Sequence, residues 1–255
     1  MDDAETKNDL ACRVAVLHAE RRELIHKLVW VVRSTVSQIF LKGTGIEVGA
    51  GDTPFPLPEG VSCYYGDVRD SADLAKYFGN DNVSLNGRID AQTFAGIPAA
   101  SQDFVITSHV IEHLYDPIGA IRAAVNVLKL GSVFVCVVPE MTKTWDCDRS
   151  PTTLAHLWTD SGDGGESTRL LAHVEHAKYV HPVLTGEHIP EAKIEDCARA
   201  TMAAGMDLHV HAWRAVDFKE LLEAIAPSSG FAVEAGISST GGNENIFVMR
   251  RTRIA

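Results

Sequence analysis

The chain has 255 residues, of which 45% are hydrophobic and 22% are charged, and its formal net charge is -11. This length suits one large α/β domain with an insertion. The acidic balance argues against nucleic acid and anionic membranes as partners, because binding to a phosphate backbone needs clustered Lys and Arg.

The start of the chain and its cysteines bear on the compartment. "MDDAETKND" is acidic and polar, unlike the basic start of a secretory signal peptide. The 5 cysteines include no CxxC pair, which favours reduced thiols over a disulfide framework. The most apolar early stretch, residues 28–40, is too short to span a bilayer and carries Arg33. We therefore expect a soluble, cytoplasmic protein.

Residues 10–41 carry apolar side chains at spacings of three and four, with charges between them. This pattern predicts an amphipathic helix or a pair of helices, which would suit a homodimer. We expect residues 1–42 to form an N-terminal helical segment and residues 43–255 to form the main domain.

Short apolar runs then alternate with helical segments. The runs are residues 45–48, 61–65, 103–108 and 132–139. Two of them are near-continuous in Val, Ile, Phe and Cys, which favours central parallel strands covered on both faces. Between the last two runs, "DPIGAIRAAVNVLKLGS" predicts a helix with Asp116 as N-cap and Gly131 as terminator.

The alternation stops after Pro139, where the sequence becomes richer in His, Gly and Asp. Residues 140–206 are predicted to be a mostly helical, acceptor-binding insertion. The alternation in "LHVHAW", residues 208–213, predicts a strand. A helix over about 216–226, a turn at "PSSG" and the strands "FAVEA" and "NIFVMRR" complete the predicted elements.

The loop "GTGIEVGAGDTPFP" follows the first strand and is built for a ligand. Glycines let the backbone approach a ligand closely. A nicotinamide site would carry a third glycine where Pro54 stands. Glu47, two residues before Gly49, suits instead a ligand with a positive end or hydroxyl donors. The prolines predict that the usual helix after this loop is delayed, shortened or absent.

"EVGAG" resembles the E/D-x-G-x-G signature of class I S-adenosylmethionine-dependent methyltransferases. The resemblance extends over about residues 43–140 and the terminal strands, although the usual "LKPGG" turn reads "LKLGS" here. It implies an α/β, Rossmann-like, doubly wound sheet, mostly parallel with an antiparallel last strand.

The resemblance also implies S-adenosylmethionine as cofactor and a set of residues that hold it. Asp67 would bind the ribose hydroxyls, and Asp90 would contact the adenine. The alternative is that Asp67 is only a turn residue and Asp90 only a loop residue. The full implied set is Glu47, Gly49, Ala50, Gly51, Asp67, Asp90, Ala91 and Ser108.

Methyl transfer to a hydroxyl needs alignment with the sulfonium and removal of a proton. "HVIEH" would place His109, Glu112 and His113 on one helical face. It resembles the metal-binding E-x-x-E-H cluster of the small-RNA 2′-O-methyltransferases and the ubiquinone O-methyltransferases, with His109 replacing the first acid. Glu112 and His113 are therefore candidate ligands for a divalent cation such as Mg²⁺, and His109 and His113 are candidate bases. In methyltransferases without a metal, an "EH" here serves packing and hydrogen bonding.

A second candidate base begins the insertion. His156 and Asp160 are one helical turn apart, so Asp160 could orient His156, with Arg149 nearby. A surface helix carrying a solvated His and Asp is the alternative. The predicted strand 208–213 would put two imidazoles and an indole on one face, which suits a sugar ring or a buried core edge. The other insertion histidines, His173, His176, His181 and His188, are read mostly as lid surface.

"DRSPTTLAHL" and "HVHAW" are similar to segments of bacterial polysaccharide and sugar methyltransferases, including the methylmannose polysaccharide enzymes. The predicted function is O-methylation of a sugar, an oligosaccharide or another small hydroxylated acceptor. An RNA 2′-O-methyltransferase and a non-catalytic, cofactor-binding module are the alternatives.

Overall fold

The computed structural model describes residues 3–238 and 242–253, with side chains from residue 13 onward. The strands are β1 Thr44–Val48, β2 Ser62–Asp67, β3 Gly87–Arg88, β4 Gln102–Ser108, β5 Leu128–Pro139, β6 Phe231–Ser238 and β7 Glu244–Arg251. The α-helices are α1 Asp3–Phe40, α2 Ser71–Phe78, α3 Pro117–Val127, α4 Leu154–Asp163, α5 Arg169–Glu175, α6 His181–Thr185, α7 Glu191–Ala203 and α8 Ala215–Ser229. Short turns of other helix types cover Ile111–His113, Met141–Lys143 and His176–Val180.

The strands form one 7-stranded sheet in the order β3-β2-β1-β4-β5-β7-β6. β1, β2, β3, β4 and β5 pair in parallel, whereas β7 is antiparallel to both β5 and β6. The predicted Rossmann-like sheet, mostly parallel with an antiparallel last strand, is confirmed. Val48 pairs with Gly66 of β2 and Thr107 of β4, so these strands end at one edge, where ligands bind in such folds.

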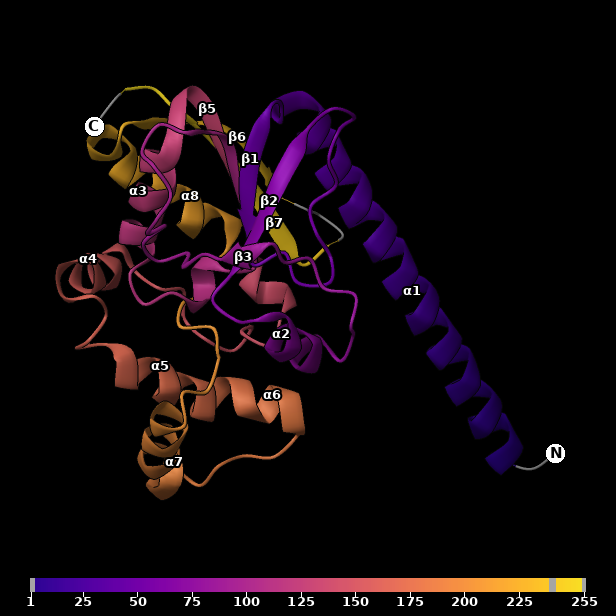
Figure 1. Cartoon of the computed structure of the whole chain (residues 1–255). Coiled ribbons are helices and arrows are strands. Elements are labelled where there is room, and N and C mark those ends of the chain that lie inside the picture. Colours follow the sequence, from indigo (N-terminus) through magenta and orange to yellow (C-terminus); the bar gives the residue numbers. More distant parts are fainter. Residues whose placement is uncertain (1–2, 239–241, 254–255) are drawn as a thin grey trace.

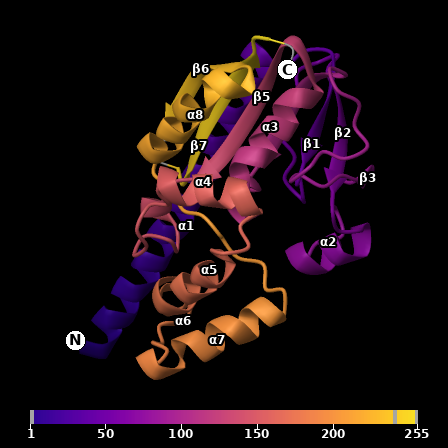
Figure 2. The same ribbon diagram turned by 90° about the vertical axis from the view of Figure 1, so that its left-hand side faces the viewer.

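Apolar side chains fill both faces of the sheet. On one face, α3 and α8 pack against the strands through residues such as Ile121 and Phe218, both fully buried (Figure 2). On the other face, Val36 from the last turns of α1 and Phe55 from the loop after β1 pack on Ile106. Because helices or loops cover both faces, the central strands can be apolar throughout.

The stretch between β1 and β2 contains no helix, as the prolines predicted. The end of α1 and the proline loop cover the sheet where that helix would lie. The predicted helix at 10–41 is one continuous helix, α1, which projects far from the rest of the molecule (Figure 1).

Three local predictions are wrong. Residues 208–213 form no strand, because their backbone N–H groups bond to loops rather than to a neighbouring strand: His211 N–H donates to the Glu112 carbonyl at 3.0 Å. The "PSSG" turn lies inside α8, which continues to Ser229 and ends at Gly230. Gly131 does not terminate α3, because the chain enters β5 directly at Leu128, whereas Asp116 caps α3 as predicted.

Among the described residues, no helix is both long enough and apolar enough to cross a membrane. Cys63, Cys136, Cys147 and Cys197 are free thiols. The side chain of Cys12 lies outside the described residues.

Candidate functional site

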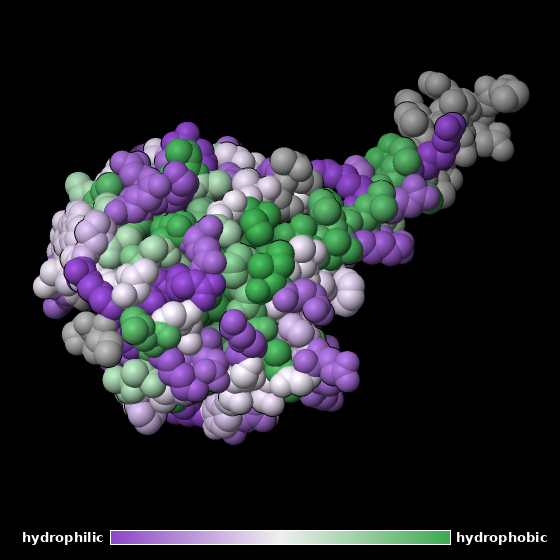
Figure 3. Space-filling view, turned by 90° about the horizontal axis from the view of Figure 1, so that it is seen from above, coloured by the Kyte–Doolittle hydropathy of each residue, from purple (hydrophilic) through white to green (hydrophobic). Residues whose placement is uncertain are grey.

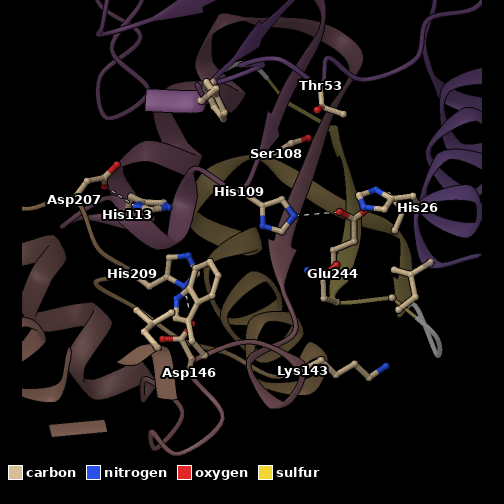
Figure 4. Close-up of a pocket in the computed structure, with 18 of the residues that line it drawn as sticks. His26, Thr53, Ser108, His109, His113, Lys143, Asp146, Asp207, His209 and Glu244 are labelled. Carbon is tan, nitrogen blue, oxygen red and sulfur yellow. Dashed lines mark hydrogen bonds and ion pairs between the residues drawn. The ribbon is translucent and has the colours of Figure 1, made fainter. Parts of the chain in front are cut away.

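A cavity of about 1120 Å³ opens at the carboxyl edge of the sheet. Its walls come from the glycine loop, α1, the segments after β4 and β5, and the linker that enters α8. Figure 4 shows His109 near its centre, with Ser108 and Thr53 on one side and His113 and His209 on the other. The cavity thus joins the predicted cofactor loop to a group of histidines.

The glycine loop can hold its shape only with glycine. Gly49 has a φ of +79° and Gly51 a φ of +57°, in the left-handed region. A Cβ on Gly49 would lie 2.4 Å from Val110, and one on Gly51 would lie 2.4 Å from Phe78. Gly49 and Ala50 line the cavity.

Glu47 is fully buried and faces the backbone of its own loop. Its two carboxylate oxygens accept from Phe55 N–H at 3.1 and 3.0 Å. Burial raises the pKa of Glu47 to about 7, although the Phe55 hydrogen bond and the charge of Arg33 oppose the shift. The carboxyl group therefore holds the exit of the loop in place.

Replacing Glu47 by glutamine is expected to flatten the dependence of stability on pH. Between pH 4.5 and about 7 the native Glu47 binds more protons than the unfolded one, so stability falls as pH rises through this window. The loss at the upper end is on the order of 3 kcal/mol, since each pKa unit corresponds to about 1.4 kcal/mol. Glutamine stays neutral and its carbonyl still accepts from Phe55. Urea unfolding at both ends of the window measures this, and equal slopes for the two proteins would contradict it.

Asp67 and Asp90 lie at the same edge, where β2 ends and where the chain leaves β3. Asp67 Oδ1 accepts from Arg69 N–H at 2.8 Å, and Asp90 Oδ1 accepts from Gln92 N–H at 2.8 Å. Each carboxylate thus closes its own turn, as aspartates commonly do. Ala91, beside Asp90, is buried. Their cofactor roles stay predictions.

His109 lies at the centre of a chain of charges in which its two carboxylate partners are buried. Its Nε2 is 3.1 Å from Glu244, and its Nδ1 is 3.5 Å from Glu112. Arg33 of α1 donates to both oxygens of Glu244, at 3.0 and 2.7 Å. Burial lowers the pKa of His109, but the two carboxylates outweigh burial and raise it to about 9. His109 is therefore an imidazolium ion at neutral pH, with both nitrogens engaged.

Two His–Asp pairs line the cavity beyond His109. His113 Nδ1 lies 2.8 Å from Asp207, and His209 Nδ1 lies 2.6 Å from Asp146. The two rings meet edge to face, with centroids 4.8 Å apart. Burial lowers the pKa of His113, but the hydrogen bond to Asp207 and the charge of Glu112 raise it above its ordinary value. An imidazole oriented by a carboxylate is a suitable general base.

The predicted metal ligands Glu112 and His113 gain a third neighbour, His209. One ligand atom from each of these residues lies within 4.8 Å of the others. Imidazole and carboxylate donors fit a divalent cation, so the donor set permits a metal here. The sequence did not single out His209 as a ligand, because it is far from "HVIEH" in the chain.

His156 and Asp160 do pair, at 3.1 Å, but they lie outside the cavity lining. The structure brings them next to His211 rather than to His109 and His113. Arg149, predicted nearby, has its guanidinium bonded to Asp146. Among the histidines read as lid surface, His173 is buried and hydrogen-bonds Thr201, and His176 lines the cavity.

Sequence reasoning missed several residues of this site, listed here: Arg33, Asp146, Asp207 and Glu244. Glu244 lies 135 residues from His109, and Asp207 lies 94 residues from His113. No spacing in the sequence connects such pairs. The only available signal for a site in this region was the enrichment in histidine after Pro139.

The middle of the chain matches a known protein family. Residues 59–136, from before β2 through most of β5, match the family model described as a methyltransferase domain. Together with the sheet order, this match supports a class I S-adenosylmethionine-dependent methyltransferase. No curated protein sequence matches the chain.

Solved structures resemble the chain in fold. A protein from Rhodobacter sphaeroides, provisionally described as a Zn-dependent alcohol dehydrogenase, is 15% identical over 85% of this chain and 87% of its own, with a TM-score of 0.50. An S-adenosylmethionine-dependent methyltransferase from Thermotoga maritima is 14% identical over 93% and 96%, with a TM-score of 0.47. The CurJ carbon methyltransferase is 12% identical, with a TM-score of 0.43. The match covers 82% of this chain but only 48% of the CurJ chain.

The residues around the loop fit the cofactor of this class. Ser108 Oγ, at the cavity wall, is buried and has no hydrogen-bond partner. Buried hydroxyls nearly always have a partner, so Ser108 is poised to bond a ligand. Gly49 and Ala50 lie on the same wall.

Proposed function

We propose that this chain transfers a methyl group from S-adenosylmethionine to a hydroxyl of a small hydroxylated acceptor bound in the cavity. One observation carries the proposal: a single cavity is lined both by the glycine loop and by two His–Asp pairs. A methyl donor and a base must reach the same acceptor atom, and this cavity has room for both.

The cofactor supplies an electrophilic methyl group on a sulfonium. In this proposal Gly49, Ala50 and Ser108 hold it, with Asp67 and Asp90 toward its ribose and adenine. The imidazolium of His109, fixed by Glu112 and Glu244, cannot accept a proton at neutral pH. It would instead donate a hydrogen bond or balance charge.

His113 is the better candidate base. Asp207 accepts a hydrogen bond from its Nδ1, which fixes the ring and leaves Nε2 as the basic nitrogen. In the proposed step, Nε2 takes the proton of the acceptor hydroxyl as the oxygen attacks the methyl carbon. The pKa of His113 is raised above the ordinary value of 6.5 for histidine. The neutral base therefore becomes available only as the pH rises beyond 6.5.

A divalent cation on Glu112, His113 and His209 is a second way to activate the hydroxyl, by lowering its pKa. This role competes with His113 as base, since a ligand nitrogen cannot also accept a proton. Methyl transfer that persists after exhaustive chelation rejects the cation.

A sugar or oligosaccharide is the acceptor that we favour, with residues 140–206 contributing to its site. Trp145 lines the cavity, is 43% exposed and lies 5.2 Å from the ring of His209. An exposed indole beside polar groups suits the apolar face and hydroxyls of a sugar ring. Trp213, the indole of the predicted strand, is only 1% exposed and belongs to the core.

Calorimetric titration with S-adenosylhomocysteine tests the class, and saturable binding is expected. A chain that binds neither this product nor S-adenosylmethionine is not a methyltransferase. Transfer of labelled methyl groups to a panel of sugars, other alcohols, amines and RNA then tests the acceptor. Labelling of sugars alone supports the proposal, whereas labelling of amines or RNA alone overturns the acceptor class but leaves the enzyme class.

We also propose that α1 joins two copies of this chain. Val14, Leu17, Leu24, Leu28 and Val31 recur at coiled-coil spacing, and Leu24 is 65% exposed. Figure 3 shows apolar residues along the projecting helix. The same apolar stripe on a second copy of α1 can pack against this one, so a second copy of the chain is the natural partner.

Introducing glutamates at Leu24 and Leu28 is expected to convert a dimer to a monomer, because paired charges in a coiled-coil seam are strongly unfavourable. Size-exclusion chromatography with light scattering measures the mass. Ala19→Glu, on the opposite side of α1, should leave the dimer intact. A wild-type monomer at the highest soluble concentration would contradict the proposal.

A further inference from the structure

A second group of histidines lies outside the cavity, between the insertion and the linker into α8. His156 and Asp160 stand one turn apart on α4, and His211 comes from the linker. Asp160 Oδ2 lies 3.1 Å from His156 Nε2 and 3.7 Å from His211 Nε2. One ligand atom from each residue lies within 4.8 Å of the others.

The burial of this group is unusual for its polarity. Asp160 and His211 are both 0% exposed. Asp160 Oδ2 and both ring nitrogens of His211 nevertheless lack a hydrogen bond of ordinary geometry. Buried polar atoms nearly always have a partner. Asp160 Oδ2 and His211 Nε2 face each other at 3.7 Å, and a group bound between them would satisfy both.

Neighbouring residues fix the orientation of these side chains. The Thr168 hydroxyl donates to Asp160 Oδ1, which leaves Oδ2 to face the imidazoles. Trp213 stacks on His211, with centroids 5.3 Å apart and planes 20° from parallel. Such supporting contacts are typical of metal ligands, whose rings and carboxylates need fixed directions.

We propose that His156, Asp160 and His211 bind a divalent transition-metal ion, with Zn²⁺ the best match. Two imidazoles and one carboxylate are typical zinc ligands, and tetrahedral coordination at about 2.0–2.1 Å from the metal separates ligand atoms by about 3.4 Å. The separations of 3.1 and 3.7 Å lie on either side of this value. The ion would tie α4 of the insertion to the linker that carries His209. This site is separate from the methyl-transfer cavity.

A metal-free network of hydrogen bonds is the competing explanation. In that case Asp160 would bond a protonated His156, and His211 would bond only the backbone of Tyr115. The two explanations differ in metal content, which can be measured without knowing the acceptor.

The test uses the full chain, purified after expression with zinc, with metal content measured by mass spectrometry. Cobalt substitution gives a second readout, because tetrahedral Co²⁺ with nitrogen and oxygen ligands absorbs visible light. Wild type is expected to hold one equivalent and to melt at a higher temperature with zinc than after chelation. His156→Gln and His211→Gln should lose that equivalent, the cobalt spectrum and the shift in melting temperature.

Two controls make the result specific. His188→Gln changes an exposed histidine of the insertion and should bind metal as wild type does. His113→Gln removes a ligand from the Glu112 cluster and should also retain the equivalent. His156 is partly exposed, so its variant is expected to fold and decides the matter even if His211→Gln does not. A wild type without metal, or a folded His156→Gln with wild-type binding, overturns the proposal.

Discussion

Replacing Arg149 by methionine is expected to lower the free energy of unfolding by about 3–5 kcal/mol. The substitution leaves the buried groups that bond the guanidinium without a partner. The Arg149 side chain is 1% exposed. Its guanidinium donates to Asp146 at 2.9 Å and to Glu175 at 2.8 Å. It also donates to the carbonyls of His209 and Val210, at 2.8 and 2.9 Å.

The linker at His209 and Val210 forms no strand, so no neighbouring strand bonds its carbonyl groups. The Arg149 guanidinium donates hydrogen bonds to these carbonyls instead. Denaturant unfolding measures the loss. Arg199→Met is a matched control, since Arg199 forms an exposed pair with Glu195 on α7 and should cost less than about 0.5 kcal/mol. A cost for Arg149→Met as small as that of the control would show that water or neighbouring groups replace the guanidinium.

Replacing His113 by glutamine is expected to lower kcat for methyl transfer by about 10²–10⁴-fold, the usual contribution of a general base. Affinity for S-adenosylhomocysteine should change little, because the proposed cofactor contacts lie on the glycine loop and Ser108. The assay uses the acceptor that the labelling panel identifies, and it compares kcat, KM and cofactor affinity.

The pH profile separates a base from a structural residue. The pKa of His113 is raised above 6.5, so the neutral base accumulates, and kcat rises, only as pH increases beyond that value. His113→Gln should lose this rising limb. Asp207→Asn should move the limb to lower pH, because it removes the hydrogen bond to a carboxylate that most raises the pKa of His113. His188→Gln serves as the control. A variant at His113 that keeps both the rate and the rising limb excludes His113 as the base.

The elements that follow local chemistry were predictable. Asp116 and Pro117 marked the start of α3, and the apolar runs around Val105 and Val135 marked the central strands. The prolines at 54 and 56 predicted the missing helix. These signals work because capping, proline geometry and full burial act within a few residues.

The segment 208–213 shows where local reasoning fails. Its alternating pattern was real, but both sets of side chains are buried, since Leu208 and His211 alike lie inside the fold. Alternation predicts a strand only when one face meets solvent. Here the linker passes between the insertion and the core, and tertiary contacts set its path.

The sequence alone determined the class of fold, the glycine loop with Glu47 and the local pair of His156 and Asp160. Each depends on residues that are close in the chain. Only the tertiary structure decided which groups share a site. It places His156 and Asp160 next to His211, and it places Glu244, with its partner Arg33, beside His109. These contacts join residues up to 211 positions apart. The packing of α1, β7 and the linker brings such residues together, and no spacing in the sequence records it.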